Sequence, residues 1–200
     1  MARPKNQVAR REALVDAAGR AIAERGIAGL RIKDIAAEAG VSAGSVLYYY
    51  PELDGLVFEV HQDAVERFLA DRRKRSDGIA DPVARLRASV ESGLPVDADD
   101  PAHRLLYELH SLADRSSAHA VLMGSLFARE SAAYATVLEV GSAQGVFRLG
   151  EPVADLARNL VVLEDGYGLH IVSRNAALDR AEALRLILGY ARAATGCSEL

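Results

Sequence analysis

A short stretch of small and hydroxyl-bearing residues has the chemistry of a surface that contacts nucleic acid. Residues 42–45 read Ser-Ala-Gly-Ser, and Tyr48 and Tyr49 follow about one helical turn later. Small residues at a helix start let its free N–H groups approach a phosphate, and a tyrosine can bond a phosphate oxygen or lie against a sugar or a thymine methyl group. We therefore predict contacts with DNA from Lys33, Ser42, Ala43, Gly44, Ser45, Tyr48 and Tyr49.

The three consecutive tyrosines cannot all face the same side of a helix. At about 100° per residue, Tyr48, Tyr49 and Tyr50 point in different directions from one helix. Tyr50 comes four residues after Val46, so these two are expected to pack inward while Tyr48 and Tyr49 face elsewhere. The alternative is that all three are core aromatics of a helical domain, but three adjacent side chains cannot all be buried on a single helix.

Two short helices must hold this stretch in place. Residues 32–39 carry apolar side chains at helical spacing with charges on the other side, and Gly40 follows where a helix needs a residue that tolerates positive φ. Ser42 is placed to cap a second short helix through its hydroxyl. Two short helices joined by a turn of about four residues containing glycine form the helix-turn-helix pattern, in which the second helix reads the duplex.

A recognisable set of residues runs through and past this motif: Asp34-Ile35-Ala36, Ala39-Gly40-Val41-Ser42, Gly44-Ser45, Tyr48, Pro51 and Leu56. In the order and spacing of these residues the chain resembles the TetR family of transcriptional regulators, strongly over about Val8 to Phe58 and only in architecture beyond. The resemblance implies a homodimer that regulates transcription, usually as a repressor released from a pseudo-palindromic operator by a small molecule.

Five positions depart from the family pattern. Leu47 stands where the family usually has tyrosine, Tyr49 where it has histidine, and Tyr50 where it has phenylalanine. Leu53 occupies the place of a phosphate-binding lysine, and Arg31 replaces the threonine that commonly caps the first motif helix. The fold inference survives these changes, whereas not every DNA contact of the family carries over.

The charge of −4 is unevenly distributed along the chain. Residues 1–50 hold eight Lys/Arg against five Asp/Glu, and residues 51–200 hold sixteen against twenty-three, so a basic head precedes an acidic body. This asymmetry is expected of a small DNA-binding regulator. A first helix is predicted over residues 8–25. The residues around its start are expected to form a mobile basic arm that touches DNA, with a solvated tail as the alternative for the first two: Arg3, Lys5, Arg10 and Arg11.

The rest of the sequence predicts helices only. A long fourth helix over residues 53–75 is expected to link a DNA-binding domain of residues 1–52 to a ligand-binding and dimerisation domain of residues 53–200. Its basic ending at residues 72–75 suits a helix C-terminus. Acid–proline pairs mark several later helix starts. We predict an all-α fold of about nine helices, the last five covering residues 82–93, 101–113, 118–144, 152–174 and 179–194.

A mixture of aromatic and polar residues in the body is typical of a ligand-cavity wall. Glu164 lies in an otherwise apolar run with no Lys or Arg within four residues, and a buried carboxylate needs a partner. A cationic effector would supply that partner if Glu164 faces the cavity, and a neutral hydrophobe would serve equally well if it does not. The predicted ligand-binding residues are Tyr107, His110, Met123, Phe127, Tyr134 and Glu164.

Apolar stripes in the last two helices predict a homodimer interface of four helices, as in the TetR family. The alternative is that these stripes face the subunit's own core. The predicted interface residues are Leu156, Leu160, Leu163, Tyr167, Leu184 and Leu188.

The sequence gives no sign of catalysis or of a cofactor. It contains no GxxxxGK[ST], GxGxxG, CxxC or HExxH motif, so we predict neither an enzyme nor a cofactor. His103 and His110 share a helix face, but a zinc site would need a third well-placed ligand, and none is predicted. We predict a cytoplasmic protein that does not bind a membrane. This prediction rests on the single Cys197, the lack of a signal peptide and the lack of a long apolar run. A helical adaptor whose tyrosine-rich motif binds protein remains the alternative function.

Overall fold

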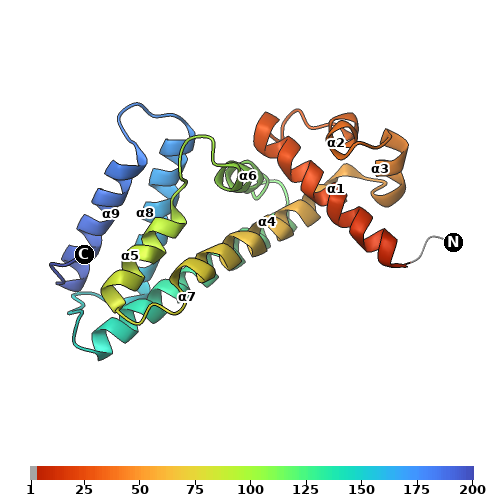
Figure 1. Ribbon diagram of the computed structural model, residues 1–200. Helices are drawn as coiled ribbons and strands as arrows, with labels where there is room; N and C mark the ends of the chain where they lie inside the picture. Colours follow the sequence, from red (N-terminus) through yellow and green to blue (C-terminus); the bar gives the residue numbers. More distant parts are fainter. Residues whose placement is uncertain (1–3) are drawn as a thin grey trace. The chain divides into compact units, whose positions relative to one another are not determined.

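Residues 4–200 are described by a computed structural model, and within them the backbone forms α-helices and no β-strand (Figure 1). This confirms the predicted all-α class. No helix in this part of the chain is long and apolar enough to cross a bilayer. The helices are α1 (Pro4–Arg25), α2 (Ile32–Ala39), α3 (Ala43–Tyr49), α4 (Leu53–Ser76), α5 (Pro82–Gly93), α6 (Pro101–His110), α7 (Ser117–Ala143), α8 (Val153–Val172) and α9 (Arg180–Thr195).

The chain forms two compact units, each with its own core. Unit 1 comprises the described residues up to Arg67 together with Pro101–Met123, and unit 2 comprises Phe68–Asp100 and Gly124–Leu200. Helices α4 and α7 therefore contribute residues to both units. Unit 1 is larger than the predicted DNA-binding domain of residues 1–52, because α6 packs against α1.

Helix α1 begins at Pro4, earlier than the predicted start at residue 8. Arg10 and Arg11 lie within this helix, as the predicted range of residues 8–25 requires, so they are not part of a mobile arm. Proline suits the first turn of a helix, because that position needs no N–H donor. Arg3 and the side chain of Lys5 lie outside the described residues.

The core of unit 1 forms where α1 packs against α2 and α6. After α1, Gly26 adopts a φ of 81°, and the N–H of Ile27 donates to the carboxylate of Glu108 on α6 at 2.9 Å. This bond fixes the segment that leads into α2. The buried apolar residues of this core include Leu14, Ala18, Ile22, Ile35, Val46, Leu56 and Val60.

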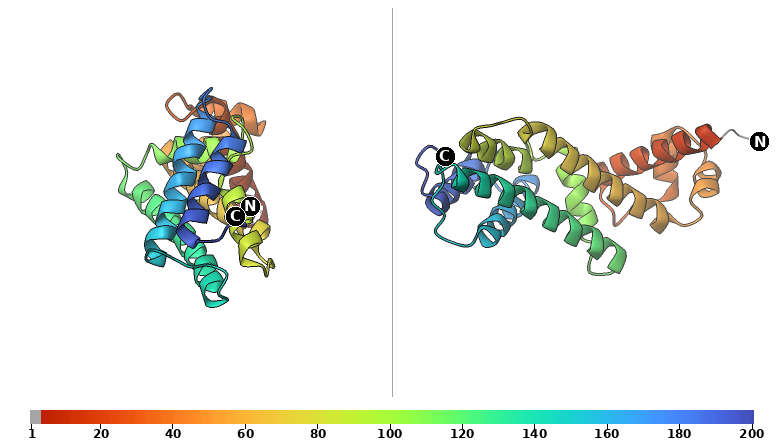
Figure 2. Two further views of the ribbon diagram at one scale, coloured as in Figure 1. Left: turned by 90° about the vertical axis from the view of Figure 1, so that its left-hand side faces the viewer. Right: turned by 90° about the horizontal axis from the view of Figure 1, so that it is seen from below.

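Unit 2 is built around α8 and α9, which run side by side (Figure 2), with α5 packed against both. The predicted helix starts are confirmed by their caps, since Asp81 accepts from the N–H of Ala84 and Asp179 accepts from that of Glu182. Pro82 occupies the first turn of α5. The core residues of this unit include Leu86, Val90, Tyr134, Leu138, Phe147, Leu160, Val161 and Ile187.

Half of the predicted dimer-interface residues are buried in the core of the subunit itself. Leu156, Leu160 and Leu188 are buried in unit 2, so they have almost no surface left to offer a partner. These three residues face the subunit's own core, which was the alternative to an interface. Leu163, Tyr167 and Leu184 are partly buried against the same core. The large apolar side chains that α8 exposes are instead Val162 and Leu169, at 56% and 50%.

Candidate nucleic-acid interface

The short helix α3 is held by a side-chain cap that the sequence predicted. Ser42 has an extended backbone, and its Oγ accepts from the N–H of Ser45 at 3.1 Å. The two serine hydroxyls are also hydrogen-bonded to each other, 2.9 Å apart. Because a helix of seven residues is too short to be stable alone, this cap and the packing of its buried face fix it.

The turn before α3 follows the predicted geometry. Gly40 adopts a left-handed φ of 65°, and its N–H points back to carbonyls in the last turn of α2. At the other end of α2, the carboxylate of Asp34 accepts from the backbone N–H of Arg31 at 3.1 Å. That bond fills one half of a capping box, so the helix keeps a cap despite the arginine at this position.

The tyrosines divide as helical spacing predicted. Val46 and Tyr50 are 0% and 3% exposed and anchor α3 from the inside, whereas Tyr48 is 73% exposed. The rings of Tyr48 and Tyr49 meet edge to face with centroids 5.1 Å apart. Each ring thereby restricts the other, so Tyr48 is presented outward with limited freedom.

Tyr50 is held in place by a charged pair, Arg11 and Glu59. Its hydroxyl donates to Glu59 at 2.5 Å, and the guanidinium of Arg11 lies 4.5 Å from the centre of its ring. Arg11 also donates to Glu59 at 2.5 Å. Burial, together with the hydrogen bond to Glu59, raises the pKa of Tyr50 above its ordinary value. The hydroxyl therefore stays protonated and keeps donating.

An open hollow of about 410 Å³ lies over the outer face of α3. It brings together most of the residues predicted to contact DNA, while Lys33 is exposed on α2 and Ala43 is exposed at the start of α3 without lining it. Arg10 of α1 also lines the hollow. From the sequence this residue was expected to touch DNA, but from a mobile arm rather than from a helix. The lining residues are Arg10, Val41, Ser42, Gly44, Ser45, Tyr48 and Tyr49.

This region also matches a known protein family. Residues 14–60 fit the family model described as bacterial regulatory proteins, tetR family. Over these residues the chain is similar to the tetR family of bacterial regulatory proteins. The match includes the α2–α3 motif and its turn, so the resemblance carried by Gly40, Ser42 and Tyr48 is confirmed.

Two regulators illustrate how far the sequence likeness extends. The HTH-type transcriptional regulator RutR of Escherichia coli is 30% identical over 105 residues, which are 52% of this chain and 49% of RutR. The HTH-type transcriptional regulator BetI of Burkholderia cenocepacia is 35% identical over 82 residues, 40% of this chain and 42% of BetI. The chain thus matches about half, or less, of the length of these curated relatives.

Solved structures share the fold over nearly the whole chain. A TetR transcription regulator from Haloarcula marismortui has a TM-score of 0.82 at 26% identity, covering 94% of this chain and 99% of its own. A transcriptional regulator from Saccharomonospora viridis, crystallised in complex with choline, has a TM-score of 0.83 at 24% identity, covering 90% and 94%. The TetR-like architecture therefore extends beyond the N-terminal domain.

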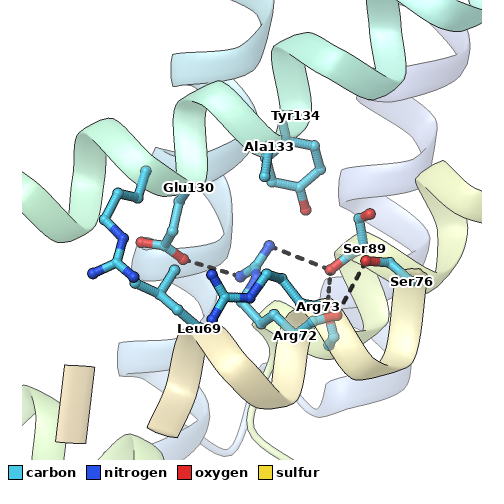
Figure 3. Close-up of a pocket in the computed structure, with 10 residues that line it drawn as sticks. Leu69, Arg72, Arg73, Ser76, Ser89, Glu130, Ala133 and Tyr134 are labelled. Atoms are coloured by element: carbon cyan, nitrogen blue, oxygen red, sulfur yellow. Dashed lines mark hydrogen bonds and ion pairs between the residues drawn. The ribbon is translucent and has the colours of Figure 1, made fainter. Parts of the chain in front are cut away.

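Unit 2 contains a second pocket, of about 100 Å³, between α4, α5 and α7 (Figure 3). Arg72 lies in its wall and is buried, whereas from the sequence it was assigned only to a basic ending that suits a helix C-terminus. Of the predicted ligand-binding residues, only Tyr134 lines this pocket. The lining residues are Leu69, Arg72, Arg73, Ser76, Ser89, Ser92, Arg129, Glu130, Ala133 and Tyr134.

Four side chains form what we call the arginine cluster: Arg72, Glu130, Tyr134 and Glu164. Arg72 donates to Glu164 at 2.9 Å and to Glu130 at 3.0 Å, and the hydroxyl of Tyr134 donates to Glu164. Glu164 therefore has a cationic partner within the chain, 92 residues away, and does not require a cationic effector to neutralise it. Burial raises the pKa of Glu130 to about 8, although Arg72 opposes the shift.

Unit 1 contains a different set, which we call the histidine cluster: His61, His119 and Met123. The Nδ1 atoms of the two histidines are 2.6 Å apart, and Nε2 of His61 is 3.2 Å from Sδ of Met123. The rings stack with centroids 4.9 Å apart. Burial, helped by His119 and His110, lowers the pKa of His61 to about 4.

The six predicted ligand-binding residues are thus divided between the units. Tyr107, His110 and Met123 belong to unit 1, whereas Phe127, Tyr134 and Glu164 belong to unit 2. Phe127 packs against the core of unit 2. Among the described residues, no group of three or more His, Cys, Asp or Glu side chains has the geometry of a metal site.

Proposed function

We propose that this protein is a sequence-specific DNA-binding regulator of transcription, acting in the cytoplasm as a repressor that a small molecule releases. The observation that carries the proposal is the outer face of α3, where Tyr48 is exposed beside small residues while Val46 and Tyr50 fix the helix from within. The family match over residues 14–60 supports it independently. We take residues 1–52 as the DNA-binding domain.

In this proposal α3 enters the major groove and the hydroxyls of Ser45 and Tyr48 meet the duplex. Hydroxyls bond phosphates and base edges alike, so this face can both position the protein and read sequence. Two copies would bind a pseudo-palindromic operator, with their reading helices about 34–36 Å apart or a multiple of that spacing.

We propose that the homodimer forms through the outer surface of α8 and its neighbour α9. Val162 and Leu169 are seven residues apart, hence on one side of α8 two turns apart, and both are exposed. Partly buried Leu163, Tyr167 and Leu184 extend the surface. A Val162→Glu, Leu169→Glu variant should sediment as a folded monomer. A variant that remains a dimer would place the interface elsewhere.

The effector is proposed to bind in the helical body, and the pocket beside Arg72 is one candidate place. Its lining offers three guanidiniums and a single aromatic ring, from Tyr134, so it does not resemble an aromatic cage for a quaternary ammonium. Choline, which the Saccharomonospora viridis regulator binds, is therefore a useful negative probe of this pocket. Effector and operator binding must be thermodynamically reciprocal.

The DNA contacts are tested by variants that remove a hydroxyl without disturbing the fold. Tyr48→Ala and Ser45→Ala should each weaken duplex binding by roughly 1–3 kcal/mol, the scale of good groove contacts. Ser45→Ala keeps the backbone N–H that Ser42 caps and loses only an exposed hydroxyl–hydroxyl bond, so its unfolding midpoint should move little. Val121→Ala, at an exposed site on α7 in unit 1, is the matched control. Normal binding by Tyr48→Ala would refute the assigned face and favour the protein-adaptor alternative.

A further inference from the structure

Two consecutive arginines of α1 are used in opposite ways. Arg11 is occupied by Glu59 and by the ring of Tyr50, so its role is structural. The side chain of Arg10 is exposed and lines the hollow over α3. Within the described part of the chain, its guanidinium has neither a carboxylate partner nor a hydrogen bond. A cation left without an internal partner at the edge of a hollow is available to an external anion.

The remaining lining of the hollow fits an anion as well. Ser42, Ser45, Tyr48 and Tyr49 bring four hydroxyl groups, and the described residues that line the hollow include no Asp or Glu. Hydroxyls donate to phosphate oxygens, and the planar guanidinium presents several N–H groups in a fork that matches phosphate geometry. The hollow is also wide and open, so a phosphate attached to a long polymer can enter it without being enclosed.

We propose that this hollow holds a backbone phosphate of the DNA duplex and that Arg10 is the cation that neutralises it. The proposal rests on the proposed function and adds a residue from α1, outside the helix-turn-helix motif, to the interface. A phosphate contact carries no sequence information but fixes the register of the protein on the duplex. Arg10 therefore positions α3 rather than selecting its bases.

The salt dependence of binding isolates this contact. Each neutralised phosphate of B-DNA contributes about −0.9 to the slope of log K against log salt concentration. On a mixed-sequence duplex, Arg10→Gln should therefore have a slope about 1 shallower than wild type, while Arg10→Lys keeps it. The control is Arg115→Gln, which removes the same charge from a highly exposed site in unit 1 that does not line the hollow. This control should parallel wild type.

Two further readouts separate the possible outcomes. The unfolding midpoint of Arg10→Gln should equal that of wild type, because the side chain has no partner among the described residues to lose. Inorganic phosphate should not raise the wild-type midpoint measurably, and clear stabilisation that Arg10→Gln abolishes would mean that the hollow binds the free ion instead.

If wild type binds duplex but Arg10→Gln has an unchanged slope, the inference about Arg10 fails alone. If wild type shows no salt-dependent duplex binding, the proposed function fails with it.

Discussion

The histidine cluster of unit 1 and the arginine cluster of unit 2 both bury polar side chains between helices, but only one of them is charged. His61 and His119 satisfy each other as neutral rings, since His119 can donate to Nδ1 of His61 while His61 donates to Sδ of Met123. In unit 2, Arg72 serves two carboxylates and Tyr134 supports one of them.

The difference sets opposite responses of the two units to pH. A proton added to Nδ1 of His61 would face the N–H of His119, so protonation of His61 in acid disrupts the cluster. In the arginine cluster a second ionised carboxylate would exceed the single guanidinium, so Glu130 tends to keep its proton. Unit 1 should therefore weaken in acid, and unit 2 should weaken as Glu130 is forced to ionise.

The largest effect should come from removing the cation of the arginine cluster. Arg72→Met leaves two buried carboxyl groups without their cation, and breaking a buried pair in this way costs about 3–5 kcal/mol of unfolding free energy. Arg73→Met, at the exposed neighbouring position, should change it by less than about 0.5 kcal/mol. Urea denaturation of both variants measures the contrast. Equal, small losses would show that Arg72 contributes no more than a solvated arginine.

The second effect is the pH dependence that Glu130 confers. Its pKa is raised from 4.5 to about 8 in the folded chain, so between these values the folded state holds a proton that the unfolded state has lost. Unfolding free energy should therefore decrease as pH rises from about 5 to 8, by roughly 2–4 kcal/mol at most. Glu130→Gln should remove this decrease. A variant that retains the wild-type slope would mean that Glu130 is ionised throughout.

The third effect is the pH dependence of unfolding free energy that His61 confers, and its sign is opposite to that of Glu130. Its pKa is lowered from 6.5 to about 4 on folding, so in this window the unfolded state binds a proton that the folded state does not. Unfolding free energy should fall by roughly 1–3 kcal/mol as pH drops through that window. His61→Leu should flatten the profile, and His170→Gln, at an exposed histidine, should not. An unchanged profile in His61→Leu would contradict the neutral cluster.

The smallest effect concerns the thioether. Met123→Leu keeps the volume but removes the weak acceptor for Nε2 of His61, and should cost less than about 1 kcal/mol. Denaturation at pH 7 measures it. A loss comparable to that of Arg72→Met would erase the distinction between the two clusters.

Local signals in the sequence predicted the helices and their ends. Gly40, Ser42, Asp81 and Asp179 act through neighbours within a few residues, so their turn and caps were readable without a structure. The inward direction of Tyr50 followed from helical spacing alone. Such features require no knowledge of which helices meet.

The clusters could not be predicted, because their partners are distant in the chain. Arg72 is 58 residues from Glu130 and 92 from Glu164, and a search within four residues of Glu164 could not find it. The four-residue spacing of His119 and Met123 on α7 was a usable signal for a shared face, but their partner His61 comes from α4. Arg10 was expected to contact DNA from a mobile arm, and its place beside α3 depends on how α1 packs in the folded unit, which the sequence does not show.

The salt dependence of duplex binding by the wild-type protein tests the central claim most directly. If α3 and its surroundings bind DNA as proposed, affinity for a mixed-sequence duplex should fall linearly on a logarithmic plot as salt rises, with a slope that corresponds to several neutralised phosphates. The slope should be reproduced when affinity is measured by a second method. Absence of duplex binding at low salt, or affinity that is independent of salt, would contradict a DNA-binding regulator.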